Sequence, residues 1–295
     1  MAMLKFERIL CPLDFSEYSA RAYDYGYSLA RHYEARLYLE HVIPALPLLY
    51  PEYASPDVVN EIQHDLAANA QRQLEKMASC HPPLAVPVEL IVKEGNPADS
   101  ILTSAEAQAA DLIVMGTHGR QGIDRLMMGS VTAKVLHRAR CPVLVVRRPA
   151  HDFVDPGAKG NSVRLHKVLF CTDFSKTAQG ALPYAISLVQ EYGAELTLLY
   201  TLDHFPQSGW QNSLIEARQR LESVVPAASL KSDKVKSTAR IGKPYQEIIQ
   251  IALEDRTDLI VMGVHGHGAV DGVIFGSTTN RVIQLGPCPV LVVRS

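Results

Sequence analysis

One spacing of glycines occurs twice in this chain of 295 residues. Each copy begins with an apolar run, continues through three glycines and ends on a serine. The first copy consists of residues 112–115, Gly116, Gly119, Gly129 and Ser130, and the second of residues 259–262, Gly263, Gly266, Gly276 and Ser277. Both fit the pattern G-x-x-G-x9-G-[ST], which predicts a buried strand, a loop and the start of a helix. Because the whole series is repeated, chance is a poor explanation for either copy.

The chemistry of this spacing favours an anion site. Gly116 and Gly119 carry no Cβ, so the backbone can approach a ligand closely there. The helix that begins at Ser130 presents free N–H groups and the positive end of its dipole, and both favour phosphate. Ser130 and Thr132 add hydroxyl groups. A single copy is also compatible with a plain tight loop, and the repetition favours the anion site.

Apolar runs alternate with helical patterns along both halves of the chain. The predicted strands are residues 6–13, 37–43, 86–92, 112–115 and 143–146, then 167–172, 195–202, 235–241, 259–262 and 289–293. The predicted helices are residues 17–34, 57–78, 98–109 and 130–138, then 176–192, 210–225 and 245–254. This alternation implies right-handed crossovers and a parallel sheet with helices on both faces. The predicted fold class is therefore α/β, with two tandem doubly wound sheets.

The two halves match at more than the glycines. Matching segments are Asp14 with Asp173, the turn 95–97 with 242–244, and residues 141–147 with 288–294. A length of 295 residues is itself typical of two domains. A stretch rich in proline and glycine with little periodicity separates the halves. We predict a first domain over residues 1–148, a linker over 149–164 and a second domain over 165–295.

Composition excludes several classes of protein. The formal net charge is −2 and the chain is 47% hydrophobic, so nothing indicates nucleic-acid binding. No apolar run approaches the length of a membrane span, and the first residues do not form a secretory signal. The five cysteines are odd in number and form no C-x-x-C pair, which argues against disulfide or zinc frameworks. We predict a cytoplasmic protein with reduced, mostly buried thiols and no membrane partner.

The motifs of common nucleotide enzymes are missing. No G-x-x-x-x-G-K-[ST] string of a Walker-type NTPase occurs. A Rossmann dehydrogenase requires G-x-G-x-x-G near the first strand, whereas residues 266–271 fail at the last glycine and follow the fourth strand of their half. No nucleophile and base stand together, and His118 and His265 lack further ligands at metal spacing. We therefore predict no efficient enzyme and no metal site, although slow ATP hydrolysis is compatible with the pattern.

Taken together, these segments resemble the universal stress protein family, in the branch that carries the G-x-x-G-x9-G-[ST] ATP-binding motif. The resemblance rests on residues 12–16, 172–175, 39–43, 95–97, 111–120 and 141–146. It implies an adenine nucleotide alpha hydrolase-like fold with five parallel strands in the order 3-2-1-4-5. It also implies ATP, alone or with Mg²⁺, across the carboxyl ends of strands one and four. Single-domain members pair through their fifth strands, so the tandem chain is expected to form this pseudo-dimer internally, and further dimerisation is left open.

Carried over residue by residue, the resemblance implies two sets of ATP-binding residues. The first set is Pro12, Leu13, Asp14, Val42, Met115, Gly116, His118, Gly119, Arg120, Gly129, Ser130, Val131 and Thr132. The second set is Cys171, Thr172, Asp173, Thr201, Met262, Gly263, His265, Gly266, Gly276, Ser277, Thr278 and Thr279. The second half departs from the first because Cys171 replaces Pro12, Thr201 replaces Val42 and His267 replaces Arg120. The first site is therefore expected to bind ATP better.

Three functions remain open at this point. The first is an ATP-binding stress or signalling protein that acts as a nucleotide-dependent binding switch, with an unidentified protein partner. The second is a slow ATPase of the same fold. The third is an interaction module that has lost its nucleotide. Asp14 and Asp173 are also compatible with a simple role at a helix start, because a serine cap follows each of them.

Overall fold

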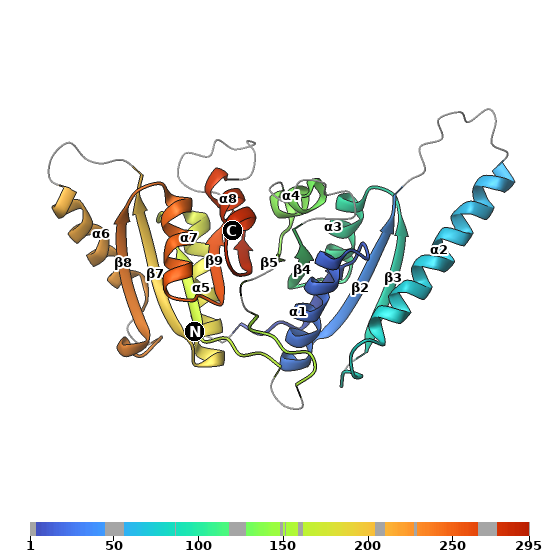
Figure 1. Cartoon of the computed structure of the whole chain (residues 1–295), viewed down its shortest axis with the longest axis horizontal. Coiled ribbons are helices and arrows are strands. Elements are labelled where there is room, and N and C mark those ends of the chain that lie inside the picture. Colours follow the sequence, from blue (N-terminus) through green and yellow to red (C-terminus); the bar gives the residue numbers. More distant parts are fainter. Residues whose placement is uncertain are drawn as a thin grey trace.

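The computed structural model describes residues 4–44, 56–85, 87–117, 128–147, 150, 152–158, 162–203, 210–226, 229–264 and 276–294. Within these ranges ten strands form one sheet, with helices on both faces (Figure 1). The sheet order is β3-β2-β1-β4-β5-β10-β9-β6-β7-β8. Each half therefore has the strand order 3-2-1-4-5, as predicted.

The elements of the first half are β1 (Arg8–Pro12), α1 (Glu17–Tyr33), β2 (Arg36–Ile43), α2 (Pro56–Ala78), β3 (Val88–Glu94), α3 (Pro97–Ala107), β4 (Leu112–Gly116), α4 (Ser130–Arg138) and β5 (Val143–Val146). Those of the second half are β6 (Lys167–Cys171), α5 (Lys176–Tyr192), β7 (Glu195–Leu202), α6 (Trp210–Val224), β8 (Val235–Ile241), α7 (Pro244–Glu254), β9 (Leu259–Gly263), α8 (Ser277–Leu285) and β10 (Val290–Val293). A short 3₁₀ helix, Ser232–Lys234, precedes β8.

The two halves join through their fifth strands. Strands β5 and β10 pair antiparallel, with Leu144 opposite Leu291, while the other strand pairs are parallel. The predicted internal pseudo-dimer is therefore confirmed, and it makes the sheet continuous from β3 to β8. Figure 1 shows α4 and α8 on either side of this junction.

Apolar residues fill both faces of the sheet. The α1, α2, α5 and α6 side has a core that includes Tyr25, Leu74 and Leu221. The opposite side, under α3, α4, α7 and α8, has a core that includes Val135 and Val282. Burial on both faces explains why the central strands read as continuous apolar runs.

Helix and strand ends follow from local chemistry. Ser16 caps α1 by accepting a hydrogen bond from the Ser19 amide, and Ser175 caps α5 in the same way. The third strand lies at 88–94, two residues later than the prediction of 86–92. Pro87 has no N–H to donate to a strand ladder, so pairing with β2 begins at Val88.

The segment between the halves packs against the first helix. Phe153, Val154, Val163 and Leu165 are buried. The Phe153 ring meets Tyr25 edge to face at 4.9 Å, and the Tyr25 hydroxyl donates to Asp152 at 2.7 Å. Because these contacts are apolar as well as polar, the described part of this segment is fixed to α1.

Candidate functional site

The sheet order brings the predicted residues of the first half to one edge. Strand β1 lies between β2 and β4, and all three run parallel. Their carboxyl ends therefore place Pro12, Val42 and Gly116 along the same edge of the sheet. The connections from β1 and β4 lead to helices on opposite faces of the sheet, α1 on one and α4 on the other. Such a switch point is where open α/β sheets bind ligands.

Helix α4 begins at this edge without a side-chain cap. Its N-cap is Gly129, and among the described residues no side-chain cap hydrogen bond is made to the first turn. The Gly129 amide itself donates to the Thr117 carbonyl at 2.8 Å, which holds the helix start next to the end of β4. In the second half, α8 begins at Gly276 in the same way, also without a side-chain cap. Within the described residues, each helix start therefore has first-turn N–H groups of the kind that accept an anion as hydrogen-bond partner.

The threonines at these helix starts have a different role from the predicted one. Thr132 was expected to offer its hydroxyl to phosphate, but it is buried and donates to the Gly116 carbonyl at 2.9 Å. Thr279 likewise donates to the Gly263 carbonyl at 3.1 Å. Both hydroxyls therefore tie the helix to the preceding strand. Ser130 and Ser277 are exposed at the same helix starts.

At the first glycine of each motif, the structure shows a physical reason for the missing side chain that differs from contact with a ligand. A Cβ on Gly116 would lie 2.9 Å from the carbonyl carbon and oxygen of Tyr18. On Gly263 it would lie 2.9 Å from the backbone of Thr177 and Ala178. The close approach that these glycines permit is therefore to the first turn of α1 and of α5. The close approach predicted from the sequence was to a ligand, whereas the neighbour that the structure describes is a helix of the chain itself.

Asp14 and Asp173 organise the loops after β1 and β6. Asp14 Oδ1 accepts from the Ser16 amide at 3.1 Å and from its hydroxyl at 2.6 Å. Asp173 Oδ1 accepts from the Ser175 amide at 3.0 Å. Both aspartates are half-buried at the sheet edge. The helix-start role considered from sequence is thus present in both halves.

The residue after each aspartate adopts an unusual backbone conformation, which sequence reasoning missed. Phe15 has φ 62° and Phe174 has φ 63°, a region that bulky side chains rarely occupy. The ring centroids of Phe15 and His41 lie 4.3 Å apart, and those of Phe174 and Tyr200 lie 4.9 Å apart. His41 Nδ1 in turn bonds the Leu13 carbonyl at 2.6 Å. Strain of this kind gathers at functional sites, and here it recurs in both halves.

The second half repeats the arrangement with a more polar lining. Thr172 Oγ1 accepts from the Phe174 amide at 2.9 Å, and the Thr172 amide donates to Leu199 at 3.0 Å. Cys171 stands at the end of β6, and burial raises the pKa of its thiol. It is therefore a neutral side chain and not a nucleophile. Thr201, Met262 and Thr278 belong to the same edge by strand and helix position.

Part of both predicted sites lies outside the described residues. These positions are His118, Gly119, Arg120, His265 and Gly266, together with His267. In the part of the chain that the structure describes, no group of three or more His, Cys, Asp or Glu side chains is placed to hold a metal ion. None of the described helices is long and apolar enough to cross a membrane.

A buried carboxyl group beneath the first site was also missed. Glu40 on β2 is 0% exposed, and its Oε1 accepts from the Ser104 hydroxyl at 2.7 Å. Its Oε2 has no hydrogen-bond partner among the described residues. Burial raises the pKa of Glu40 to about 7, although the Ser104 bond and the charge of Lys93 act in the opposite direction. A lone acid within the apolar run 37–43 was the signal in the sequence.

The second half has an apolar pair at the same place. Pro12 pairs with Glu40 and Cys171 pairs with Leu199, so Leu199 is the counterpart of Glu40. Ile251 of α7 is the counterpart of Ser104 of α3, since each follows the proline that opens its helix by seven residues. The titrating group is therefore a property of the first half.

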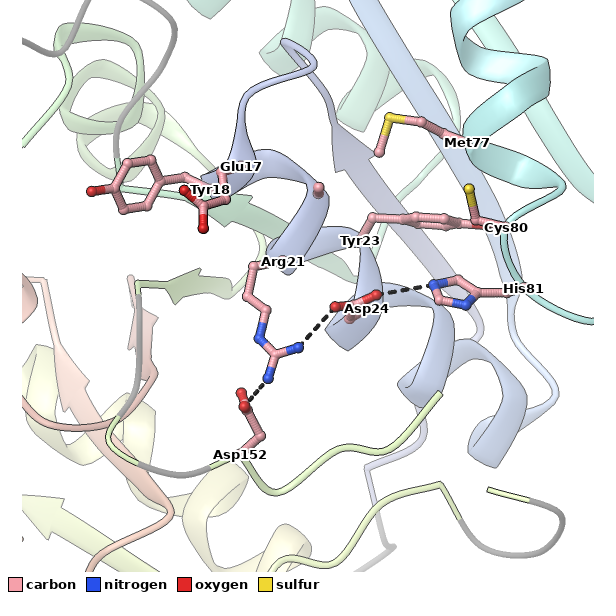
Figure 2. Close-up of a pocket in the computed structure, with 10 residues that line it drawn as sticks. Glu17, Tyr18, Arg21, Tyr23, Asp24, Met77, Cys80, His81 and Asp152 are labelled. Carbon is pink, nitrogen blue, oxygen red and sulfur yellow. Dashed lines mark hydrogen bonds and ion pairs between the residues drawn. The ribbon is translucent and has the colours of Figure 1, made fainter. Parts of the chain in front are cut away.

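A cavity of about 660 Å³ lies on the flank of the first half, between α1 and the end of α2 (Figure 2). A chain of ion pairs crosses it: His81 Nε2 bonds Asp24 at 3.0 Å, and Arg21 bonds both Asp24 and Asp152. None of its lining residues belongs to the predicted ATP site. Because these ion pairs link His81, Asp24, Arg21 and Asp152 to one another, the network joins α1, the end of α2 and the segment at Asp152.

Comparison with known proteins gives one consistent result. The model of the universal stress protein family matches residues 5–147 and 164–294. A universal stress protein from Mycolicibacterium smegmatis is 26% identical over 299 residues, which cover 97% of this chain and 96% of that protein. One from Methanocaldococcus jannaschii is 34% identical over 148 residues, 50% of this chain and 85% of that protein. A crystal structure of a universal stress protein from Archaeoglobus fulgidus aligns with a TM-score of 0.72 at 26% identity, and covers 98% of this chain and 97% of that one.

Proposed function

Because the chain belongs to the universal stress protein family, we propose that it binds ATP at the carboxyl edge of each half and acts as a nucleotide-dependent binding switch in a stress response. The observation that carries this proposal is the pair of uncapped helix starts at Gly129 and Gly276, each next to the end of its fourth strand. A triphosphate is the kind of ligand that such N–H groups bind. The proposal extends to cytoplasmic location, which agrees with five free cysteines.

The proposed roles follow from position. Pro12, Leu13, Asp14 and Val42 would hold the nucleoside, with Met115, Gly116 and Arg120 beside it. His118, Gly119 and residues 129–132 would hold the phosphates, with or without Mg²⁺. In the second half the same roles fall to Cys171, Thr172, Asp173, Thr201, Met262, Gly263, His265, Gly266 and residues 276–279. The strained Phe15 and Phe174 support a site at both places because strain is retained where function needs it.

The proposal assigns no catalytic residue. The described edge offers backbone N–H groups, hydroxyls and one aspartate per half, and its buried thiol is neutral. These groups bind and orient a nucleotide, but they do not form a nucleophile and base pair. Slow ATP hydrolysis and a nucleotide-free interaction module are the alternatives. We retain residues 1–148 and 165–295 as the proposed limits of the two domains.

The first test is the ligand that accompanies the purified chain. We expect mass spectrometry of the denatured protein to release ATP, and calorimetry of the emptied chain to show binding at both halves. Saturating ATP is expected to raise the melting temperature, since a ligand at 100 times its Kd stabilises the folded state by about 2.7 kcal/mol. No ligand and no heat at millimolar ATP would favour the interaction module. Sustained rapid phosphate release would favour an enzyme.

Helix-start variants assign the sites. Gly129→Glu is expected to remove the stronger site and Gly276→Glu the weaker one, because each places a carboxylate where phosphate would meet the N–H groups. A carboxylate at a helix N-terminus is favourable for the helix itself, so both variants are expected to fold. Gly157→Glu, an exposed position outside the sites, makes the same charge change as a control. Two unchanged isotherms in the variants would refute this placement.

A further inference from the structure

The second half contains a cavity on the helix face opposite α8. Its volume is about 370 Å³, within the usual range for small-molecule pockets. Its apolar walls are Phe170 of β6, Leu182 of α5 and Val224 of α6. It lies on the α5 and α6 side of the sheet, whereas α7 and α8 cover the other side.

The polar groups of this cavity are few and carry no negative charge. Arg220 of α6 lies over the Phe174 ring, 3.9 Å from its centroid. Among the described residues Arg220 forms no ion pair, in contrast to Arg218, which pairs with Glu222 at 3.4 Å. Thr172 also lines the cavity, and its hydroxyl proton has no acceptor in the described part of the chain. An arginine stacked on a ring keeps its N–H edge free for a planar or tetrahedral anion.

One replacement between the halves explains why this cavity reaches the sheet. Tyr23 and Leu182 are both the seventh residue of their helices, α1 and α5. Tyr23 is 2% exposed, and its hydroxyl reaches the Ala78 carbonyl at 3.5 Å, so its ring spans the space between α1 and the end of α2. Leucine is shorter and leaves that space open down to Phe170. The flank cavity of the first half accordingly includes Tyr23 but no residue of β1.

The cation above the cavity is also specific to the second half. Leu74 of α2 and Leu221 of α6 are both fully buried against the sheet and mark equivalent positions. The residue before Leu74 is Gln73, and the residue before Leu221 is Arg220. Likewise Thr172 stands where the first half has Leu13. The second half has therefore both opened the cavity and placed a positive charge and a hydroxyl on it.

We infer that the groove between α5 and α6 is a binding site for a small organic anion, whose apolar body enters between Leu182 and Val224 and whose acidic group meets Arg220. The ligand class is an aromatic or aliphatic acid. This site differs from the proposed ATP site because its apolar walls lie on the α5 and α6 side of the sheet, whereas α8, whose start would hold phosphate, lies on the other side. Thr172 is the one residue assigned to both.

The test uses 8-anilino-1-naphthalenesulfonate, a fluorescent apolar anion, with the full chain. We expect saturable binding that benzoate displaces and that phenol, which lacks the charge, displaces poorly. Leu182→Tyr restores the residue of the first half and is expected to abolish this binding. Arg220→Gln restores the other first-half residue and is expected to weaken it about tenfold, the scale of a lost charged hydrogen bond. Arg218→Gln is the matched control and is expected to bind as wild type.

Unchanged binding in either Leu182→Tyr or Arg220→Gln would overturn the inference. Melting curves check that both variants fold, and Arg220 is exposed, so its replacement leaves the core intact. Saturating ATP distinguishes this site from the proposed nucleotide site. Retained probe binding supports a separate site, whereas complete displacement by ATP would overturn it. Failure of ATP to bind at all leaves the probe experiment unaffected.

Discussion

Gly116→Ala is expected to lower the free energy of unfolding by about 2–3 kcal/mol, a large loss for one methyl group. The added Cβ would lie 2.9 Å from two backbone atoms of Tyr18. Carbon atoms in favourable contact lie about 3.5–4.0 Å apart, so α1 or β4 would have to move. Backbone atoms cannot rotate away as a side-chain end can. Urea denaturation of the purified variant measures the loss.

Gly26→Ala is the matched control for this prediction. Gly26 is also buried in the first half, in α1, but its added Cβ would meet Cys11 at 3.6 Å, an ordinary contact. Alanine also favours the helix over glycine, so stability is expected to stay the same or to rise by up to about 1 kcal/mol. Equal stability losses in the two variants would show that glycine content, and not the contact with Tyr18, sets the cost.

Glu40 is expected to make stability fall between about pH 4.5 and 8. Burial raises the pKa of Glu40 to about 7 from the usual 4.5 of a glutamate. The folded chain therefore holds a proton that the unfolded chain releases in this range, so the stabilisation is complete at low pH and is lost as pH rises through 7. The shift corresponds to about 3 kcal/mol. Urea denaturation at a series of pH values, compared between wild type and Glu40→Gln, isolates this group.

The decisive quantity is the difference in free energy of unfolding between Glu40→Gln and wild type, followed as a function of pH. The gain from Glu40→Gln is expected to grow by about 3 kcal/mol from pH 4.5 to 8. Glu94→Gln removes an exposed carboxylate from the end of β3 and is the matched control for the loss of one charge. The double variant Glu40→Leu, Ser104→Ile copies the pair of the second half and is expected to remove the dependence as well. A flat Glu40→Gln difference would mean that Glu40 is solvated when charged.

The fold was largely predictable because its determinants are local. Apolar runs predicted the positions of the strands, and the serine caps predicted where α1 and α5 begin. Helix α4 and strands β5, β7 and β8 have the predicted limits. The order of the strands and the junction between β5 and β10 came from the family resemblance. The ends of β1 and β3 differed, because proline and register decide where a ladder begins.

The roles of single residues at the site were less predictable because they depend on distant neighbours. Gly116 contacts Tyr18 from another element, and Thr132 bonds back to Gly116. No spacing in the sequence contains those contacts. Glu40 and Arg220 were visible in the sequence, but the burial of Glu40 and the stacking of Arg220 on the Phe174 ring arise only from packing. Comparison of the two halves at equivalent positions would have flagged both.

The two halves that pair through β5 and β10 belong to one covalent chain, and this has a consequence for their association. In a pair of separate subunits both copies are identical, and the pair dissociates on dilution. Here the partner is always present, since the two halves share one backbone and their association does not depend on protein concentration. Each half is also free to acquire its own chemistry, as the acid at Glu40 and the cation at Arg220 illustrate. One molecule thus combines two chemically different halves at a fixed ratio.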